Sequence, residues 1–240
     1  MIINGTINQQ KNTDTNSYGI MQIQSDKGST VTLNGTIYLD WSLLVKGSTF
    51  TVTGTGLLGR SAGSWHDTYV SVEKREDLGG KFILDGGKTA NLSALAVNEL
   101  SSAELKNGAN ADFSQSATIS SGASLTISNS NLTTETLTNN GTITMDSGSF
   151  LAFGSYAGTS AITIDTAGYD KTKIAKLIDY TGTGSVDYGT IIGNYDSDLF
   201  TVLDNDLFIG KADMNVIQVN SVWAGNAPGT EVAEGYYFGF

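Results

Sequence analysis

The chain lacks cysteine altogether and contains one proline, one histidine and only 13 basic residues against 24 acidic ones. The absence of cysteine excludes disulfide frameworks, thiolate metal sites and cysteine nucleophiles. The net charge of −11 makes nucleic acid and anionic lipid poor partners, because their phosphates repel an acidic protein. No apolar stretch of the sequence approaches the roughly 18 residues of a membrane-spanning helix, so we expect no membrane insertion by this chain.

Small polar residues are abundant instead. Gly, Thr, Ser and Asn together occupy 101 of the 240 positions, while apolar residues make up 39%. The apolar share is below the usual range for globular proteins. Short alternating runs of Val, Ile and Leu nevertheless indicate a folded chain rather than a disordered one.

Two short phrases recur along the sequence. The tetrapeptide Asn-Gly-Thr-Ile occurs at 4–7, 34–37 and 140–143. A second phrase begins at Gly28, Gly47 and Gly122 and continues with Ser or Ala, then with an apolar residue alternating with Thr or Ser. The first two glycines are 19 residues apart and the third lies 75 residues further on, which indicates a repeat of about 19 to 20 residues.

The alternation predicts β-strands with one apolar face. Val31 and Leu33, for example, fall on one side of a period-2 pattern and the neighbouring threonines on the other. The best candidates for helices, 94–106 and 170–177, also alternate as strands between turn residues. We therefore expect an all-β protein.

Short strands with Gly and Asn corners fit a β-solenoid, a two-sheet sandwich or a closed barrel. The repeats favour the solenoid, in which each coil buries a thin apolar stripe on its equivalent about 4.8 Å away. The predicted fold is a single-stranded right-handed parallel β-helix with a short capping strand pair near its C-terminal end, although the sequence determines neither handedness nor coil number. Twelve coils of about 20 residues would give a rod on the order of 55 Å long.

Three stretches depart from the repeat and set the expected boundaries. We expect coils over 1–165, with residues 60–78 protruding as a charged and aromatic loop. Residues 166–219, which are rich in Tyr and Asp, are expected to form terminal coils and a cap. Residues 220–240 are typical of a linker or tail, or of the start of a following module. Because the first residues lack the pattern of a signal peptide, we expect one module of a larger protein.

The repeats are similar to a known family. Residues 122–145, with Ser-Gly-Ala-Ser-Leu-Thr-Ile-Ser and Leu-Thr-Asn-Asn-Gly-Thr-Ile-Thr, resemble the passenger repeats of bacterial autotransporter adhesins. The segments 162–165, 176–180 and 206–209 resemble the capped end of such passengers. The resemblance covers most of residues 28–210. It rests on amino-acid composition rather than on specific sequence motifs. It implies a secreted β-helix on the bacterial cell surface that serves adhesion or spacing.

Polysaccharide-degrading β-helix enzymes are the catalytic alternative. Asn12-Thr13-Asp14 matches the first acidic motif of polygalacturonases, where carboxylates act as acid and base. The sequence has no Asp-Asp pair, Gly-His-Gly or Arg-x-Lys to complete that set. We therefore expect a non-catalytic protein without a cofactor.

Residues 60–78 supply the candidate ligand contacts. His66 is the only histidine and, without cysteine, cannot anchor a transition-metal site of the usual kind. Trp65 and Tyr69 can stack on a sugar ring, although Trp65 folding back onto the rod is a competing interpretation. Together with Arg75, these residues are the predicted contacts.

Closely spaced carboxylates offer a candidate calcium site at Asp196, Asp198, Asp204 and Asp206. Their spacing matches neither an EF-hand nor the glycine-rich calcium roll. Because Asp-rich corners are common without metal, we expect no metal site.

The aromatic tail is a candidate assembly contact. An exposed aromatic strand invites pairing with another chain. The residues concerned are Tyr236, Tyr237, Phe238 and Phe240.

The leading hypothesis is a non-catalytic module of a secreted or surface adhesin, a stiff stalk whose loops bind a glycan or protein of a host or neighbouring cell. The first alternative is a self-associating building block of an extracellular filament or layer. The second is a β-helix enzyme acting on polysaccharide.

Overall fold

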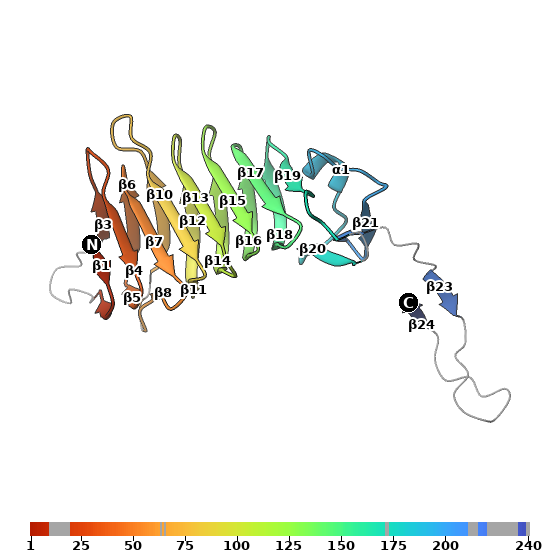
Figure 1. The fold of residues 1–240 in the computed structure, drawn as a ribbon, viewed down its shortest axis with the longest axis horizontal. Coiled ribbons are helices and arrows are strands. Elements are labelled where there is room, and N and C mark those ends of the chain that lie inside the picture. The colour runs from red at the N-terminus through yellow and green to blue at the C-terminus, as the bar shows by residue number, and fades with distance from the viewer. Residues whose placement is uncertain are drawn as a thin grey trace, which may run out of the picture.

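The computed structural model describes residues 1–9, 20–62, 64, 66–170 and 173–210, together with the backbone of 216–219 and 235–238. The described chain forms a parallel β-solenoid of about seven turns, with antiparallel strands at its C-terminal end (Figure 1). The predicted fold class, a parallel β-helix with a capping strand pair, is confirmed.

Each turn contributes strands to three faces. Face A is an eight-stranded parallel sheet: β1 (Ile2–Ile3), β4 (Thr30–Leu33), β7 (Thr49–Thr53), β10 (Lys81–Asp85), β13 (Ser102–Lys106), β15 (Ser124–Ser128), β17 (Thr142–Asp146) and β19 (Ile162–Asp165). Face B contains β2 (Thr6–Asn8), β5 (Thr36–Leu39), β8 (Leu57–Arg60), β11 (Lys88–Ala90), the first halves of β14 (Asn110–Ile119), β16 (Asn131–Asn139) and β18 (Phe150–Gly158), and β20 (Ala175–Tyr180).

Face C contains β3 (Ile20–Gln24), β6 (Ser42–Lys46), β9 (Tyr69–Glu73), β12 (Leu92–Val97) and the second halves of β14, β16 and β18. In the later turns one long strand thus covers two faces. A register shift between Phe113 and Ser116 of β14 marks the bend between them.

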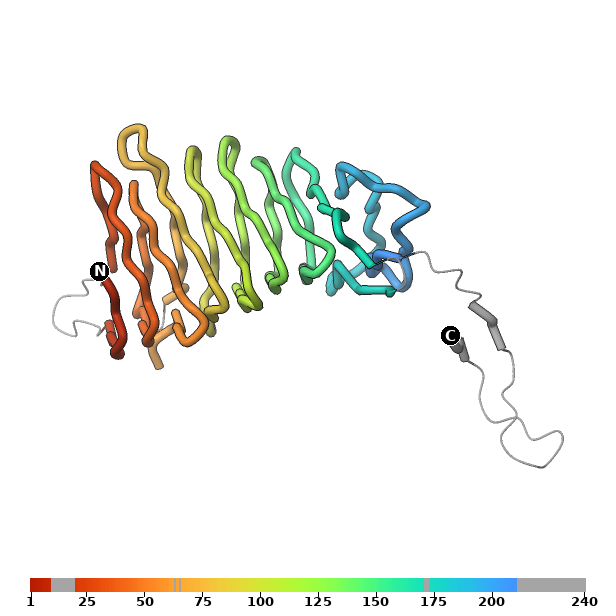
Figure 2. The backbone as a smooth tube through the Cα atoms, in the orientation of Figure 1, coloured from red at the N-terminus to blue at the C-terminus, as the bar shows by residue number. Residues whose placement is uncertain are grey.

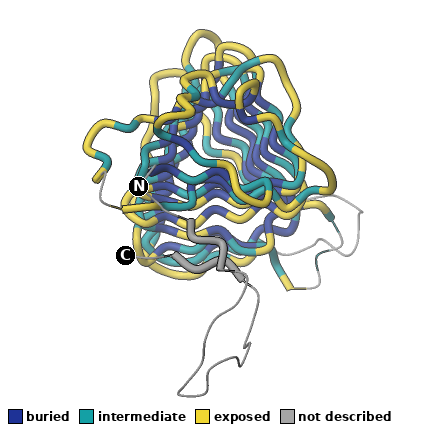
Figure 3. Tube along the Cα trace, turned by 90° about the vertical axis from the view of Figure 1, so that its right-hand side faces the viewer, coloured by how far each residue is buried: buried dark blue, intermediate teal, exposed yellow. Residues whose placement is uncertain are grey.

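The core is a set of apolar columns that run along the stack. Because neighbouring strands are parallel and in register, each inward side chain lies on its equivalent in the next turn. One column of face A consists of Ile3, Leu33, Val52, Leu84, Leu105, Ile127, Met145 and Ile164. In the neighbouring column the rings of Phe50 and Phe82 stack with centroids 6.2 Å apart. Figure 3 looks along the stack and shows the buried segments gathered inside it.

The repeated glycine phrase has the predicted structure. Gly28, Gly47 and Gly122 have φ angles of 76°, 56° and 73°, which glycine adopts without strain. Val31 pairs with Phe50, 19 positions later, as the spacing of the phrase predicts.

The stack has about seven turns, fewer than the twelve that a uniform division of the chain into coils of about 20 residues would give. Partners on face A are 18 to 22 positions apart in most turns. The interval is 30 positions between Ile2 and Thr32, however, and 32 between Phe50 and Phe82. Dividing the chain evenly into 20-residue coils ignores the extra residues in these longer turns and in the capping segment, so it gives too many turns.

Residues 60–78 do not form a single protruding loop, so that expectation is wrong. β9 lies within this segment, and its Val70 and Val72 are fully buried. Only the connection before β9 and the turn at 74–78 leave the regular coil. Figure 2 shows the second of these, in gold, reaching beyond the neighbouring connections.

The corners between faces are held by polar side chains. The carboxylate of Asp146 accepts hydrogen bonds from the Ser128 and Ser149 hydroxyls, at 2.7 and 2.6 Å, and from the amides of Asn129 and Gly148. Partial burial would raise the pKa of Asp146, but these hydrogen bonds outweigh it and lower the pKa. The charged carboxylate therefore joins two successive turns.

The C-terminal end of the stack is closed by a cap. β20 pairs in parallel with β18 and antiparallel with β22 (Asp206–Ile209), which also pairs antiparallel with β21 (Phe200–Leu203). The short helix α1 (Tyr188–Ile191) precedes this pair and buries Tyr188 and Ile191. In the tail, β23 (Val216–Val219) pairs antiparallel with β24 (Gly235–Phe238).

Candidate functional site

Three of the predicted ligand contacts, His66, Tyr69 and Arg75, lie between Phe50 and Phe82, in the turn with the longest interval between register partners on face A. His66 stacks on Trp41, with ring centroids 5.5 Å apart and planes 22° apart. Trp41 belongs to the connection between β5 and β6, one turn earlier. Tyr69 opens β9 three residues after His66, its backbone amide donates to the carbonyl of Trp41 at 3.1 Å, and the residue is half-buried. We call Trp41, His66 and Tyr69 the aromatic corner. Sequence reasoning missed Trp41, although a tryptophan in the short connection between two strands was a usable signal.

The connection that carries His66 folds back onto the preceding turn. The Ser64 hydroxyl donates to the carbonyl of Asp40 at 2.6 Å, and the Arg60 guanidinium donates to the carbonyl of Ser64 at 2.5 Å. Asp67 accepts from the Gln115 amide at 2.7 Å. The aromatic corner is therefore held by the coils on both sides rather than on a free loop. Trp65 lies outside the described residues.

Arg75 lies in a different place. The turn at 74–78 is closed by two backbone hydrogen bonds between Arg75 and Leu78, of 2.8 and 3.0 Å. The Arg75 guanidinium pairs with Asp26, and Lys74 pairs with Glu99 at 2.7 Å. We call residues 74–78 the charged turn.

The structure does not bring all the predicted contacts into one site. The aromatic corner and the charged turn lie at opposite ends of β9, a five-residue strand. At about 3.3 Å per residue, this strand separates them by more than roughly 13 Å. A ligand the size of a monosaccharide would therefore contact one patch and not the other.

Face C between these patches is fixed electrostatically. Lys46 pairs with Glu73 of the next turn at 2.9 Å. Partial burial would raise the pKa of Glu73, but hydrogen bonds from Lys46 and Ser71 outweigh it and lower the pKa. The pair orients the end of β9 from which the charged turn departs.

Two of the four calcium candidates, Asp196 and Asp206, have carboxylates that are engaged within the chain. The Asp196 carboxylate accepts from the amide of Asp198 at 2.8 Å, within one turn. Asp206 pairs with Lys176 at 2.6 Å, and Asp204 has a φ of 51° in the β21–β22 turn. Within the described residues no group of three or more His, Asp or Glu side chains is arranged to hold a metal ion.

A hollow of about 460 Å³ lies between the last coil and the cap. Tyr156, Tyr180 and Asp187 line it. Asp187 already accepts from Gly189 and Thr190, and the Tyr156 hydroxyl is also engaged within the chain. These polar groups thus already make hydrogen bonds within the chain.

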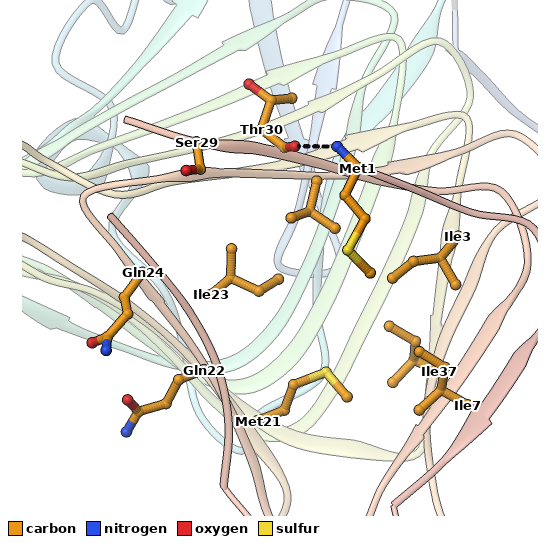
Figure 4. Close-up of a pocket in the computed structure, with 11 residues that line it drawn as sticks. Met1, Ile3, Ile7, Met21, Gln22, Ile23, Gln24, Ser29, Thr30 and Ile37 are labelled. Atoms are coloured by element: carbon orange, nitrogen blue, oxygen red, sulfur yellow. Dashed lines mark hydrogen bonds between the residues drawn. The ribbon is translucent and has the colours of Figure 1, made fainter. Parts of the chain in front are cut away.

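A second hollow lies at the N-terminal end of the described stack. Its volume is about 660 Å³, and Figure 4 shows the side chains of Met1, Ile3, Ile7, Met21 and Ile23 directed into it. The N-terminal amino group donates to the carbonyl of Thr30 at 3.0 Å (Figure 4).

Two further predictions concern residues whose side chains are not described. The assembly candidates Tyr236, Tyr237 and Phe238 belong to β24, of which only the backbone is described, and Phe240 lies outside the described residues. Asn12-Thr13-Asp14, on which the catalytic alternative depends, also lies outside them.

Comparisons with known proteins identify no relative. No protein family model, curated protein or solved structure matches this chain. Over the described residues, no helix has the length and apolar character needed to cross a membrane.

Proposed function

We propose that this chain is a non-catalytic module of a secreted or cell-surface bacterial adhesin, in which the β-solenoid is a stiff stalk that presents a binding patch to a glycan or protein. One observation carries the proposal. Phe50 and Phe82 are register partners on face A although 32 positions separate them, against 18 to 22 in the regular turns. In repeat proteins such insertions commonly carry the binding residues.

The aromatic corner is the better of the two patches in that turn. Stacked rings offer a large apolar contact at a low cost in conformational entropy, which suits the apolar face of a sugar ring or a protein side chain. The charged turn is exposed, and its ion pairs contribute little binding energy because water and salt screen them. The core columns beneath hold the aromatic corner rigidly, which lowers the entropy lost on binding.

The test uses point substitutions, because deleting 61–78 would also remove β9 from the core. We expect the double variant His66→Ala with Tyr69→Ser to reduce binding to cells or immobilised glycans about tenfold or more. Its far-UV circular dichroism should remain that of the parent. The matched control is Thr126→Ala with Thr144→Ala on the outer side of face A, which should bind like the parent.

Two outcomes would contradict the proposal. Binding that survives both the aromatic-corner variant and Lys74→Ala with Arg75→Ala would show that this turn is not the contact. Release of reducing ends from an acidic polysaccharide by the purified chain would favour the enzymatic alternative.

A further inference from the structure

The last turn of the solenoid has no strand on face C. It contributes β20 to face B, and Ile192 bridges to Ile162 of β19 on face A. Between these contacts the chain runs over 181–191 as an irregular segment and the short helix α1 (Figure 1). The second half of β18 therefore pairs with β16 alone among the described residues.

This edge of β18 presents backbone groups to the place of the missing strand. On three preceding turns, the carbonyls of Val97, Ile119 and Asn139 accept hydrogen bonds from amides of the following turn, at 2.9, 2.8 and 3.0 Å. Gly158 is the register partner of Asn139, yet Asn139 is fully buried and Gly158 is exposed. Because the peptide groups of a strand alternate in direction, the amide and carbonyl of Tyr156, two positions before Gly158, also point toward the missing strand.

The hollow of about 460 Å³ lies beside this edge. Its lining comes from residues 156–161 of one turn and residues 180–191 of the next, and the structure describes both ranges in full. The rings of Tyr156 and Tyr180 line the hollow, and each lies with its centroid 5.9 Å from that of Phe153. The volume is within the range of about 300–1,000 Å³ that is typical of ligand sites.

The hydrogen-bonding groups of the hollow favour an extended peptide over a sugar. The Tyr156 hydroxyl donates to the carbonyl of Ser160, and the Asp187 carboxylate caps α1. The backbone of the β18 edge has no such partner strand. Residues 154–161 also contain neither a charged residue nor proline, which natural edges use to prevent pairing. In β-strand addition, main-chain hydrogen bonds to such an edge supply the affinity.

The charge of this part of the chain indicates a cationic peptide. Residues 107–210 contain eleven acidic and three basic residues, so they carry −8 of the total charge of −11. Residues 1–106 carry only −1. Asp187 is among the described residues that line the hollow, and no Lys or Arg is among them. A cationic segment is therefore attracted to this end of the solenoid.

We propose that the hollow between 156–161 and 180–191, which we call the cap groove, binds an extended cationic peptide of a partner protein as the missing strand of face C. The peptide backbone pairs with Tyr156, an apolar side chain enters the groove against the tyrosine rings, and a Lys or Arg lies beside Asp187. The aromatic corner belongs to an earlier turn, so this site does not depend on the proposed adhesin function.

The first test uses a fluorescein-labelled peptide, Lys-Val-Thr-Val-Lys-Val-Lys, and fluorescence anisotropy with the full chain. We expect a dissociation constant on the order of 10 μM at low salt, and weaker binding at about 0.5 M NaCl. The same peptide with Glu in place of Lys should not bind. Two further peptides are N-methylated at alternate residues, one in each register, and one of the two should bind about tenfold more weakly because it lacks the amides that face β18.

Substitutions in the chain test the place of binding. Ser185 is exposed and lines the cap groove, so Ser185→Trp should fill it and weaken binding about tenfold or more. Ser121→Trp, at an exposed corner of an earlier turn, is the matched control and should bind like the parent. Asp187→Asn keeps a side chain that can cap α1 and removes the charge, so it should weaken binding about threefold. Asp112→Asn removes the same charge on face B and should have no effect.

Hydrogen exchange locates the paired backbone. Saturating peptide should slow the exchange of the Tyr156 amide, because that amide then donates to the peptide. Exchange in β4, at the other end of the stack, should be unchanged.

Several results would overturn the proposal. One is the absence of binding to the parent at about 1 mM peptide, which is also the result if residues 211–240 already occupy the cap groove. Equal binding of the Lys and Glu peptides would remove the role of charge. Unchanged binding by Ser185→Trp, or by both N-methylated peptides, would show that the contact is not strand addition in this groove.

Discussion

Ser48 and Ser101 occupy equivalent corners between faces C and A, and both are almost fully buried. The Ser101 hydroxyl oxygen accepts a hydrogen bond from the amide of Gly80 in the preceding turn, at 3.2 Å. Among the described residues, the Ser48 hydroxyl has no hydrogen-bond partner. The same substitution should therefore lower stability at Ser101 but not at Ser48.

Ser101→Ala leaves the buried amide of Gly80 without this acceptor, and an unsatisfied buried group costs about 1–3 kcal/mol. Ser48→Ala removes a hydroxyl that is buried without compensation, so the free energy of unfolding should stay constant or rise by up to about 1 kcal/mol. We predict that the two variants differ by about 2 kcal/mol, with Ser101→Ala the less stable.

The assay is urea denaturation followed by circular dichroism, with the slope of the unfolding free energy against urea compared among the three proteins. Equal slopes show that the variants unfold in the same way as the parent, which repeat proteins do not guarantee. Equal destabilisation by the two substitutions would refute the reasoning, because it would mean that the hydrogen bond to Gly80 contributes nothing specific.

Three further predictions concern the core, a corner carboxylate and a close backbone contact. Phe82→Ala should lower the unfolding free energy by about 3–5 kcal/mol in the same assay, because it leaves a cavity beside Phe50; a loss under about 1 kcal/mol would contradict the stacked core. Asp146→Asn should lower the free energy of unfolding by about 1–3 kcal/mol near neutral pH. Because the pKa of Asp146 is lowered in the folded state, the stability difference between parent and variant should disappear as the pH falls below about 4. A stability difference that is constant with pH would contradict a stabilising charge. Gly79→Ala should destabilise the protein by more than about 2 kcal/mol, because the new Cβ would overlap the Leu100 carbonyl. The Cβ of Gly54→Ala would meet no atom within 4 Å, so this control should change stability by less than about 0.5 kcal/mol. Similar thermal midpoints for the two variants would contradict this distinction.

The solenoid was predictable because its physical requirements recur locally. A glycine with positive φ followed by alternating apolar residues marks a corner and a strand, and the spacing of Gly28 and Gly47 equals one turn. The tetrapeptide Asn-Gly-Thr-Ile does not by itself indicate on which face of the solenoid the following strand lies. Its first two copies stack directly, with Ile7 on Ile37 in face B, but Ile143 of the third lies in face A. The phrase thus encodes a corner and not a particular face.

The charged segment 60–78 was misread because composition was given more weight than pattern. Tyr69-Val70-Ser71-Val72 has the alternation of a core strand, and β9 is such a strand despite its charged neighbours. The four-residue helix α1 had no detectable period, since its start depends on one capping side chain, Asp187.

Proximity in sequence did not predict which of the candidate ligand contacts lie together. His66 and Arg75 are near in sequence, yet the chain crosses an entire face of the solenoid between them. The pairing of His66 with Trp41 arises between successive turns. Such pairs become predictable only when the register of each turn is known, and the longest turn is where the repeat gives the least information about register.

The vertical stacking of turns is tested most directly by disulfide formation on the outer side of face A. Thr126 and Thr144 are partners in adjacent strands, with Thr163 one strand further on. Neighbouring strands lie about 4.8 Å apart, within the range of a disulfide, and alternate strands lie about twice as far apart. The chain has no native cysteine to interfere. We predict that Thr126→Cys with Thr144→Cys forms an intramolecular disulfide in mild oxidant and that Thr126→Cys with Thr163→Cys does not. In an antiparallel meander, β16 would separate the first pair. Failure of that pair to cross-link, or equal cross-linking of both pairs, would contradict the solenoid.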